Sequence, residues 1–448
     1  MFESALSIII ALGVLITFHE FGHYYVARLC GVKVLRFSVG FGKPIYKYTA
    51  KSGTEFVLAM IPLGGFVRML DSREDKVPES LKHQAFDNKN VWQRIAVVFA
   101  GPLANFILAI IIYALVAGMG LQALAPKISG VAQNSPLAQT QIEAGAEITQ
   151  VNGVPTHSWE DVNLALADLI GQTGRYSVRY LPADSSIEEE GSFTLNRWLV
   201  GQEPNTLITQ FGAQPWRPMV VPTVAEVVPG GAAEQAGFKI GDTVLEINEE
   251  SISGWQSFVT WVQSNPATAL QVLIERDGQT QLLTLTPTAR EVEGATTGFA
   301  GLGVAKPVLS EDDLRVREFG FFGAAVYGVQ QTWQMTSLTL SSIGKMLQGL
   351  ISLDNLSGPI TIAKVASASA DSGVQSFLKF MAYLSVSLGV LNLLPIPMLD
   401  GGHLLFFGIE AVRRKPVSER VQGFAYRIGA SLLFAMMAVA LFNDIARL

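Results

Sequence analysis

Three long stretches of this chain are mostly apolar. Residues 95–119 contain no charged side chain, residues 377–399 hold one lysine near their start, and residues 428–442 are shorter but uninterrupted. A helix rises about 1.5 Å per residue, so roughly 20 apolar residues are needed to cross the hydrocarbon core of a bilayer. The pattern predicts three transmembrane helices.

A fourth apolar stretch opens the chain. Residues 5–18 are apolar, and the helix is expected to continue through His19, Glu20 and His23 to about Cys30. A cleaved signal peptide usually has basic residues at its start and a small-residue cleavage site, and neither is evident here. We therefore interpret this stretch as a retained transmembrane helix.

Residues 321–343 form a fifth uncharged stretch of different character. They are rich in Gln, Ser, Thr and Gly. Such a helix is expected to lie at the membrane interface or to pack on protein.

The basic residues orient the predicted spans. Residues 28–94 carry 12 Lys/Arg and residues 411–427 carry 5, whereas residues 118–319 carry 11 Lys/Arg against 24 Asp/Glu. Because Lys and Arg are enriched beside spans on the cytoplasmic side, we expect both termini and the long acidic region outside. Residues 31–94 and 411–427 are then expected inside.

The acidic region between the second and third spans contains an internal repeat. Its strand-like runs alternate with Gly, Pro and Asn turns, as in a soluble domain. Four residues recur 96 positions later: Gly145, Val151, Asn152 and Trp159 correspond to Gly241, Ile247, Asn248 and Trp255. A repeat of this length predicts two tandem copies of one domain, because solenoid repeats have periods of about 20–50 residues.

Residues 34–70 are expected to form a β-hairpin. The strand-like runs 44–49 and 55–61 flank a Gly-containing turn at residues 50–54. A solvated loop would not need such apolar strands. We predict that the hairpin dips towards the membrane beside the first span, against protein or a water-filled cavity.

Composition narrows the class of protein further. The chain of 448 residues is 49% hydrophobic and 16% charged, which fits partial residence in lipid. The net charge of −6 argues against nucleic acid as a partner. One cysteine, Cys30, excludes an internal disulfide framework and a Cys-based structural zinc site.

The first span carries the strongest chemical signal. His19 and His23 are separated by one helical turn, so both imidazoles can reach one metal ion, with Glu20 close enough to act on a water. Zinc binds such ligands, and catalytic zinc sites typically have three protein ligands plus water. Ionisable residues inside a span are costly and usually functional. We predict a catalytic zinc site.

A third ligand must come from another part of the chain. Asp400 follows the third span, where Pro395 and Pro397 are expected to break the helix and Gly401-Gly402 to end it, so that its carboxylate can be aimed back into the protein. His403 is an alternative ligand, although a hydrogen-bonded histidine at a helix end is the simpler interpretation. With four spans, the first and third run in the same direction and Asp400 reaches the depth of His19. A fifth span at 321–343 would place Asp400 on the opposite side.

Several linked motifs resemble the site-2 protease family. These are HExxH in the first span, Gly101-Pro-Leu-Ala-Asn105 in the second and Asn392-x-x-Pro-x-Pro-x-x-Asp-Gly-Gly in the third. The acidic repeat resembles a pair of circularly permuted PDZ domains, best in residues 227–242. The first copy departs from that pattern at Ala146 and in a hairpin extended by residues 188–190. With residues 37–42 and 62–66, the pair resembles the bacterial regulator-of-sigma-E branch.

The resemblance implies zinc-dependent intramembrane proteolysis. His19, His23 and Asp400 would bind Zn²⁺, and Glu20 would serve as general base and then protonate the leaving amine. Asn392 would match the family's substrate-holding asparagine, although a helix–helix hydrogen bond is an alternative role.

The resemblance also implies a type of substrate. The hairpin residues Val57, Leu58 and Ala59 could hold an unwound substrate by strand addition. The substrate would be a single-span membrane protein already trimmed outside, such as an anti-sigma factor, or a remnant signal peptide. The PDZ pair would exclude untrimmed substrates. A catalytically inactive PDZ scaffold is the alternative function; a transporter is disfavoured because the spans show no inverted repeat.

The expected fold is therefore a polytopic α-helical membrane protein with four transmembrane helices, a membrane-associated β-hairpin and two tandem α+β PDZ domains. We expect it in a bacterial inner membrane, with the PDZ domains periplasmic and the active site towards the cytoplasm. The expected segments are the first span 1–30, the cytoplasmic hairpin region 31–94, the second span 95–120, the PDZ domains 121–215 and 216–306, a linker with interfacial helices 307–375, the third span 376–412 and the fourth span 424–446.

Overall fold

A computed structural model describes residues 2–73, 77–202, 207–218, 220–292, 295–304, 309 and 311–446. Within this part of the chain, four helices are long and apolar enough to cross a membrane. They are α1 (Phe2–Leu29), α2 (Val91–Gly118), α9 (Val374–Leu393) and α11 (Glu419–Ala446). The expectation of four such helices is confirmed.

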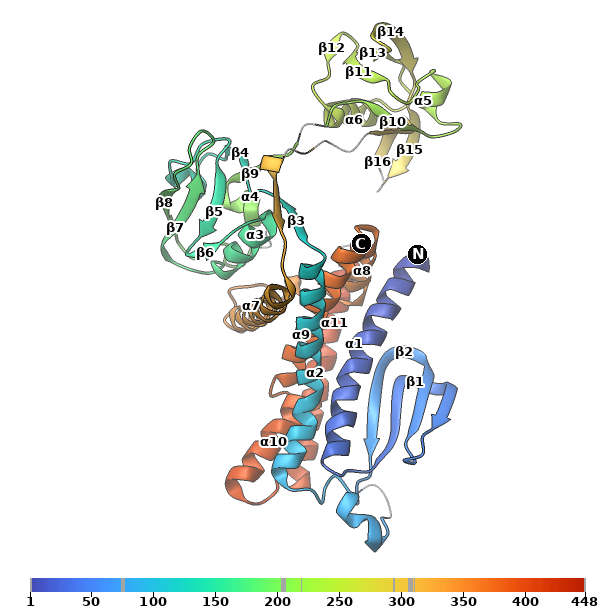
Figure 1. The fold of residues 1–448 in the computed structure, drawn as a ribbon, viewed down its shortest axis with the longest axis vertical. Coiled ribbons are helices and arrows are strands. Elements are labelled where there is room, and N and C mark those ends of the chain that lie inside the picture. Colours follow the sequence, from blue (N-terminus) through green and yellow to red (C-terminus); the bar gives the residue numbers. More distant parts are fainter. Residues whose placement is uncertain are drawn as a thin grey trace.

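The four helices form one bundle (Figure 1). Helix α2 lies at its centre and contacts α1, α9 and α10 (Asp400–Arg413). Apolar side chains from α1, α2, α7 (Phe321–Leu347) and α9 form the bundle core, including Leu15, Leu108, Met335 and Val386. Figure 1 shows both described chain ends near the end of the bundle that carries the two β-rich units, whereas the α10–α11 connection lies at the opposite end.

Helix α7 (Phe321–Leu347) is not among the four candidate spans. It appears nearly end-on in Figure 1 while α1 and α2 run vertically, so it lies across the bundle. Large apolar side chains remain exposed along it: Phe321, Phe322, Val326, Val329, Trp333, Leu340 and Leu347. A helix lying at the membrane interface would bury such a stripe in lipid, and this interpretation of residues 321–343 stays a prediction.

The sheet beside α1 is more elaborate than one hairpin. Strands β1 (Val34–Thr49) and β2 (Glu55–Met69) pair with each other, but each is bent into two segments. Gly40 and Gly42 have φ of 91° and 89°, a conformation that favours glycine and lets β1 turn back. Residues 36–39 consequently lie between residues 55–58 and residues 65–68.

Two β-rich units contain sheets of the same order. In the first β-unit (β4 to β9) the order is β6-β5-β7-β8, and in the second β-unit (β10 to β17) it is β12-β11-β13-β14. Trp159 and Trp255, matched in the sequence repeat, begin the equivalent helices α3 and α6. Elements of the first unit are β4 (Ile128–Val131), η2 (Leu137–Gln139), β5 (Glu147–Val151), β6 (Val154–Pro155), α3 (Trp159–Asp168), β7 (Gly174–Leu181), β8 (Glu189–Leu195), α4 (Leu207–Phe211) and β9 (Ala213–Pro215).

The second β-unit leads into a return connection to the bundle. Its elements are β10 (Val224–Val227), α5 (Ala232–Gln235), β11 (Thr243–Ile247), β12 (Glu250–Ser251), α6 (Trp255–Ser264), β13 (Leu270–Arg276), β14 (Gln279–Leu285), β15 (Thr288–Val292), β16 (Ala295–Phe299) and β17 (Leu302–Val304). Strand β3 (Leu121–Leu124) follows α2 directly in the chain, and strand β18 (Leu314–Arg317) pairs with it. The chain therefore leaves the bundle and returns to it through this pair of strands. Short helices η1 (Glu79–Gln84), η3 (Glu311–Asp313), η4 (Leu353–Asn355) and α8 (Pro359–Asp371) complete the described elements.

Polar contacts fasten helix α3 of the first β-unit to the bundle at both ends. The Lys345 ammonium of α7 donates to the carbonyls of Ala167 and Asp168, at 3.0 and 2.8 Å. These carbonyls lie in the last turn of α3, where a cation complements the helix dipole. At the other end of α3, Lys379 of α9 lies 3.2 Å from the Glu160 carboxylate.

The second β-unit has a buried ion pair at positions where the first β-unit holds uncharged residues. The fully buried Asp242 carboxylate accepts two hydrogen bonds from the Arg276 guanidinium, at 2.6 and 2.7 Å. Positions 96 residues earlier hold Ala146 and Tyr180. Burial alone would raise the pKa of Asp242, but the hydrogen bonds from Arg276 and the Lys239 amide lower it.

We expect Arg276→Ala to destabilise the second β-unit by about 3 kcal/mol, because it leaves a buried charge unpaired. The folded-state pKa of Asp242 lies below its unfolded value of about 3.9, so the contribution is fully present above that pH and is lost as pH falls through the folded pKa. Hydrogen exchange of β13 at pH 7 and pH 3 measures both effects.

The matched control is Arg290→Ala. The Arg290 guanidinium lies 3.6 Å from the centroid of the Phe299 ring in the same unit, a contact worth about 1 kcal/mol at an exposed site. Equal loss of protection in β13 for both variants at pH 7 would refute the special role of the Asp242–Arg276 pair.

Candidate active site

The two histidines of HExxH converge inside α1. His19 and His23 are each 9% exposed, and their Nε2 atoms lie 3.3 Å apart. Helical spacing explains this arrangement, because residues i and i+4 share one face. Glu20 lies between them in sequence and is partly buried.

Asp400 approaches the same point from the start of α10. Its Oδ2 atom lies 3.3 Å from Nε2 of His19 and 3.5 Å from Nε2 of His23. The three ligand atoms all lie within 4.8 Å of one another, and they are the one such group found among the described residues. The structure therefore brings together the three side chains that the sequence selected as ligands.

A tight turn between α9 and α10 brings Asp400 there. Helix α9 ends at Leu393, and the chain turns through the two prolines before α10 begins at Asp400. Gly401 and Gly402 lie in the first turn of α10, so the expectation that they end the preceding helix is wrong. A Cβ on Gly402 would lie 2.5 Å from the Ile396 carbonyl oxygen, and one on Gly401 would lie still closer to the Leu394 carbonyl oxygen. Side chains at these two positions would push the turn open, so glycine is required for the close return of the chain.

Residues of helix α2 contact both imidazoles at their Nδ1 atoms, on the side away from Asp400. Nδ1 of His23 lies 2.8 Å from the Val97 carbonyl oxygen, so it is the protonated nitrogen, and Nε2 is left for a metal. A Cβ on Gly101 would collide with the His23 ring. One turn later, the Asn105 side chain contacts Nδ1 of His19 at 3.1 Å.

These supporting residues were assigned no role from the sequence. Gly101 and Asn105 contributed only to the family resemblance. The sequence did contain a signal for Asn105, because it is the single carboxamide in the uncharged, mostly apolar stretch 95–119. A buried amide in a span needs a partner, and the nearest candidates were the histidines of α1.

The donor set fits a zinc ion. Two imidazole nitrogens and one carboxylate oxygen are the ligands of many catalytic zinc sites, which keep a fourth position for water. The Asp400 Oδ2 atom is buried and has no hydrogen-bond partner among the described residues. A bound cation would satisfy this oxygen, which is otherwise costly to bury.

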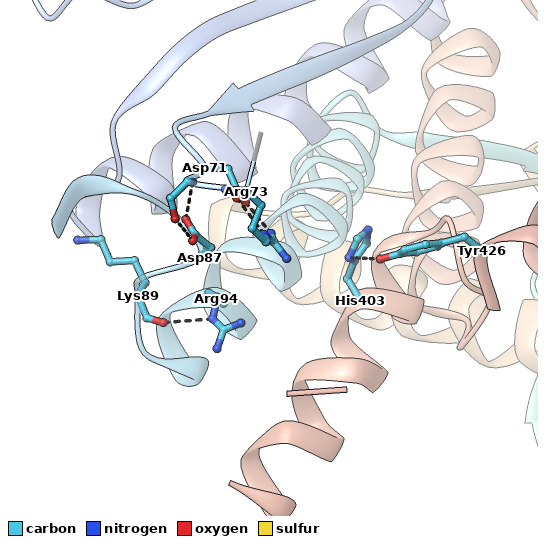
Figure 2. A network of polar contacts seen from close by, with 8 residues as sticks. Asp71, Arg73, Asp87, Lys89, Arg94, His403 and Tyr426 are labelled. Carbon is cyan, nitrogen blue, oxygen red and sulfur yellow. Dashed lines mark hydrogen bonds and ion pairs between the residues drawn. The ribbon is translucent and has the colours of Figure 1, made fainter. Parts of the chain in front are cut away.

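His403 lies outside the group of three. Figure 2 shows its ring directed at Tyr426 of α11, with Nδ1 3.3 Å from the phenol oxygen. This is the hydrogen-bonded role expected as the simpler interpretation of His403. The same view shows Arg73 paired with Asp71 and Arg94 bonded to the Lys89 carbonyl. Arg94 also lies 2.5 Å from Glu410, which joins the start of α2 to α10.

The remaining residues singled out from the sequence lie on two elements. Asn392 is partly buried in the last turn of α9. Val57 and Ala59 are buried in β2, whereas Leu58 is 47% exposed. Val57 pairs with both Ser38 and Lys47, and Leu58 pairs with both Val39 and Tyr46. Strand addition at Val57 and Leu58, as expected from the sequence, is therefore blocked, because both sides already have partners.

A different part of β2 lies against the site. A Cβ on Gly65 would lie 3.0 Å from Cγ of Glu20 and 3.0 Å from Cγ2 of Ile16. Gly65 pairs with Val39 on one side, and no strand of the described chain pairs with its other side. The segment 64–67 therefore brings backbone close to Glu20.

Comparison with known proteins defines the class. The description "Peptidase family M50" matches residues 7–436. The chain belongs to this family, the site-2 protease family, and is a zinc metalloprotease.

Curated relatives match almost the full length. "Regulator of sigma-E protease RseP" from Salmonella typhimurium is 45% identical over 440 residues, covering 98% of each chain. The protein of that name from Escherichia coli K12 is 44% identical over 442 residues, covering 99% of this chain and 98% of that one. A Vibrio cholerae relative, whose name describes a zinc metalloprotease, is 44% identical over 447 residues, covering 99% and 98%.

Among solved structures, the PDZ domain of an SdrC-like protein from Listeria monocytogenes matches 20% of this chain and 93% of its own length. Its sequence identity is 18% and its TM-score is 0.17, which is too low to assign the fold of either β-unit.

Proposed function

We propose that this protein hydrolyses peptide bonds within transmembrane segments, with His19, His23 and Asp400 as zinc ligands and Glu20 as general base. The observation that carries the proposal is the convergence of these ligands from α1 and α10 within a bundle of membrane-length helices. Ionisable groups are expensive at that depth, so their convergence points to chemistry.

Each residue of the site has its own proposed role in hydrolysis. Zinc, when bound there, supplies the Lewis acidity that makes water a nucleophile near neutral pH. Glu20 takes the proton from this water and then delivers it to the leaving amide nitrogen. Asn392, at the end of α9, holds the substrate backbone near the site. The low exposure of both histidines keeps bulk water away from the reacting atoms.

We also propose that the substrate lies extended along residues 64–67 of β2. A helical substrate hides its carbonyls in hydrogen bonds, so the scissile segment must unwind before hydrolysis. An unpaired strand side offers replacement hydrogen bonds. Val57 and Leu58 would act indirectly, by supporting the sheet from within. This replaces the direct role expected for these two residues, whereas the direct role of Ala59, which pairs with Pro44, stays a prediction.

Photo-crosslinking tests this placement. A benzoylphenylalanine residue in place of Phe66 should capture the transmembrane segment of a substrate in a Glu20→Gln background, where cleavage does not remove it. The control position is Tyr48, which is exposed on the far segment of the same sheet. Capture at Tyr48 equal to that at Phe66 would disprove the proposed position of the substrate.

The proposed substrate is a single-span membrane protein trimmed beforehand outside the membrane. Relatives named regulators of sigma-E protease favour an anti-sigma factor, and remnant signal peptides have the same chemistry. We propose that the β-units are PDZ domains that exclude untrimmed proteins. Their common sheet order and the sequence pattern of residues 227–242 support this assignment.

The proposed location is a bacterial inner membrane, with the β-units in the periplasm and the site towards the cytoplasm. The basic segments 31–94 and 411–427 support this orientation. The α10–α11 connection, which falls within residues 411–427, lies at the end of the bundle opposite the β-units, and the β1–β2 sheet lies beside α1 (Figure 1).

The function is tested with one substrate in two forms. The purified protein in lipid vesicles should cleave a single-span protein that ends shortly after its span, and should spare the same protein carrying a folded external domain. Binding of the trimmed form without any cleavage would instead favour the alternative function, an inactive peptide-binding scaffold.

A further inference from the structure

Asn105 of α2 is fully buried and contacts the candidate zinc site. Its side-chain amide lies 3.1 Å from Nδ1 of His19. The amide atom that makes this contact is Nδ2. The Oδ1 atom of the same amide is buried and has no hydrogen-bond partner among the described residues. Both features concern one side chain, and a single rotation of its amide would affect both.

The protonation of His19 decides how the amide must point. A neutral imidazole has one nitrogen that donates and one that accepts. Nε2 of His19 faces Asp400 and His23, so it must keep its lone pair for the metal. Nδ1 of His19 then carries the proton and needs an acceptor. An amide nitrogen is a donor and cannot fill that role.

We infer that Asn105 is a positioning residue whose carbonyl oxygen accepts the Nδ1 proton of His19, fixing that ligand's tautomer and ring orientation. The inference rests on the proposed zinc site. Rotating the amide by half a turn exchanges its oxygen and nitrogen, two groups of nearly equal size. The rotation gives His19 Nδ1 its acceptor and gives Oδ1 its partner.

Helix α2 then supports the two histidine ligands by two different carbonyl acceptors. His23 uses the main-chain carbonyl of Val97, and His19 uses the side-chain carbonyl of Asn105. Ser385 of α9 donates to the main-chain carbonyl of Asn105 at 2.8 Å, which holds Asn105 from the other side. Asn105 therefore contacts both α9 and His19, the first ligand on α1. The turn at the end of α9 leads to the third ligand, Asp400.

Zinc affinity of the purified full-length chain, measured by chelator competition, tests the inference. Asn105→Leu keeps the size but removes the acceptor, and we expect affinity to fall about 10- to 100-fold. Asn105→Asp and Asn105→Thr each retain an acceptor, one charged and one neutral. At least one of them should restore affinity to within about threefold of wild type, a much smaller loss than the roughly 10- to 100-fold typical when a group that supports a metal ligand is removed. Thr336→Ala, which removes a hydrogen bond to the Thr332 carbonyl within α7 and leaves Asn105 untouched, should bind zinc as wild type does.

The outcomes separate the possible failures. Wild-type affinity in Asn105→Leu overturns the inference, as does failure of both acceptor variants to restore binding. A wild-type chain that binds no zinc overturns the proposed site itself. Thermal melting of each zinc-free variant identifies misfolding, and the Co²⁺ absorption spectrum of the loaded Asn105→Leu chain should show an altered ligand field. An unaltered spectrum in that variant also contradicts the inference.

Discussion

Glu20→Gln should reduce cleavage of a trimmed single-span substrate by about 1,000-fold or more while zinc remains bound. Glutamine has almost the shape of glutamate but cannot accept the proton from water, and positioned acid–base groups typically contribute 10²–10⁴-fold. The carboxylate is not one of the three converging ligands, so metal content should stay near one ion per chain. Cleavage rate and zinc content are measured on the same preparation.

The control for this change is Glu234→Gln. Glu234 accepts a hydrogen bond from the Gly230 amide in the second β-unit, far along the chain from α1. It should cleave as wild type does. Cleavage by Glu20→Gln at the wild-type rate would remove Glu20 from the mechanism, and loss of zinc in that variant would make it a ligand.

Asp400→Ala should lower zinc affinity by more than about 100-fold and abolish cleavage with it. Losing a group that merely supports a ligand costs 10- to 100-fold, so losing the ligand itself should cost more. The two histidines would remain together on α1 without the oxygen that lies 3.3–3.5 Å from both. Elemental analysis after dialysis, together with chelator competition, gives the magnitude.

His403→Ala serves as the comparison for Asp400→Ala. His403 lies three residues further along α10 but contacts Tyr426 and lies outside the group of three ligands. Zinc should therefore stay bound in this variant. Unchanged zinc in Asp400→Ala together with loss in His403→Ala would reverse the assignment of the third ligand.

The sequence predicted features that depend on local pattern or on strong physical cost. Four spans followed from the length of apolar runs. Within the described residues α7 is not a candidate span, in line with the polar composition of residues 321–343 and with the need for Asp400 to lie on the side of His19. Three ionisable residues within five positions of a span singled out α1. The meeting of Asp400 with the histidines followed from the alternating direction of the spans.

Long-range pairing was beyond this reasoning. Residues 44–61 had the pattern of a simple hairpin, but whether each strand bends back depends on Gly40 and Gly42, whose positive φ appears only in the fold. That bend places Leu58 between two partners and brings Gly65 to Glu20. The contact of Asn105 with His19 likewise depends on how α1 and α2 face each other, which apolar periodicity does not specify.

The central claim is that one zinc ion, held by α1 and α10, cleaves peptide bonds inside a bilayer. The most direct measurement is zinc titration of the metal-free protein in lipid vesicles that contain a trimmed single-span substrate, with the cut site located by mass spectrometry. Cleavage should rise in proportion to added zinc, saturate at one ion per chain and cut within the apolar segment. A cleavage rate that does not change with added zinc, or a cut outside that segment, would contradict the account.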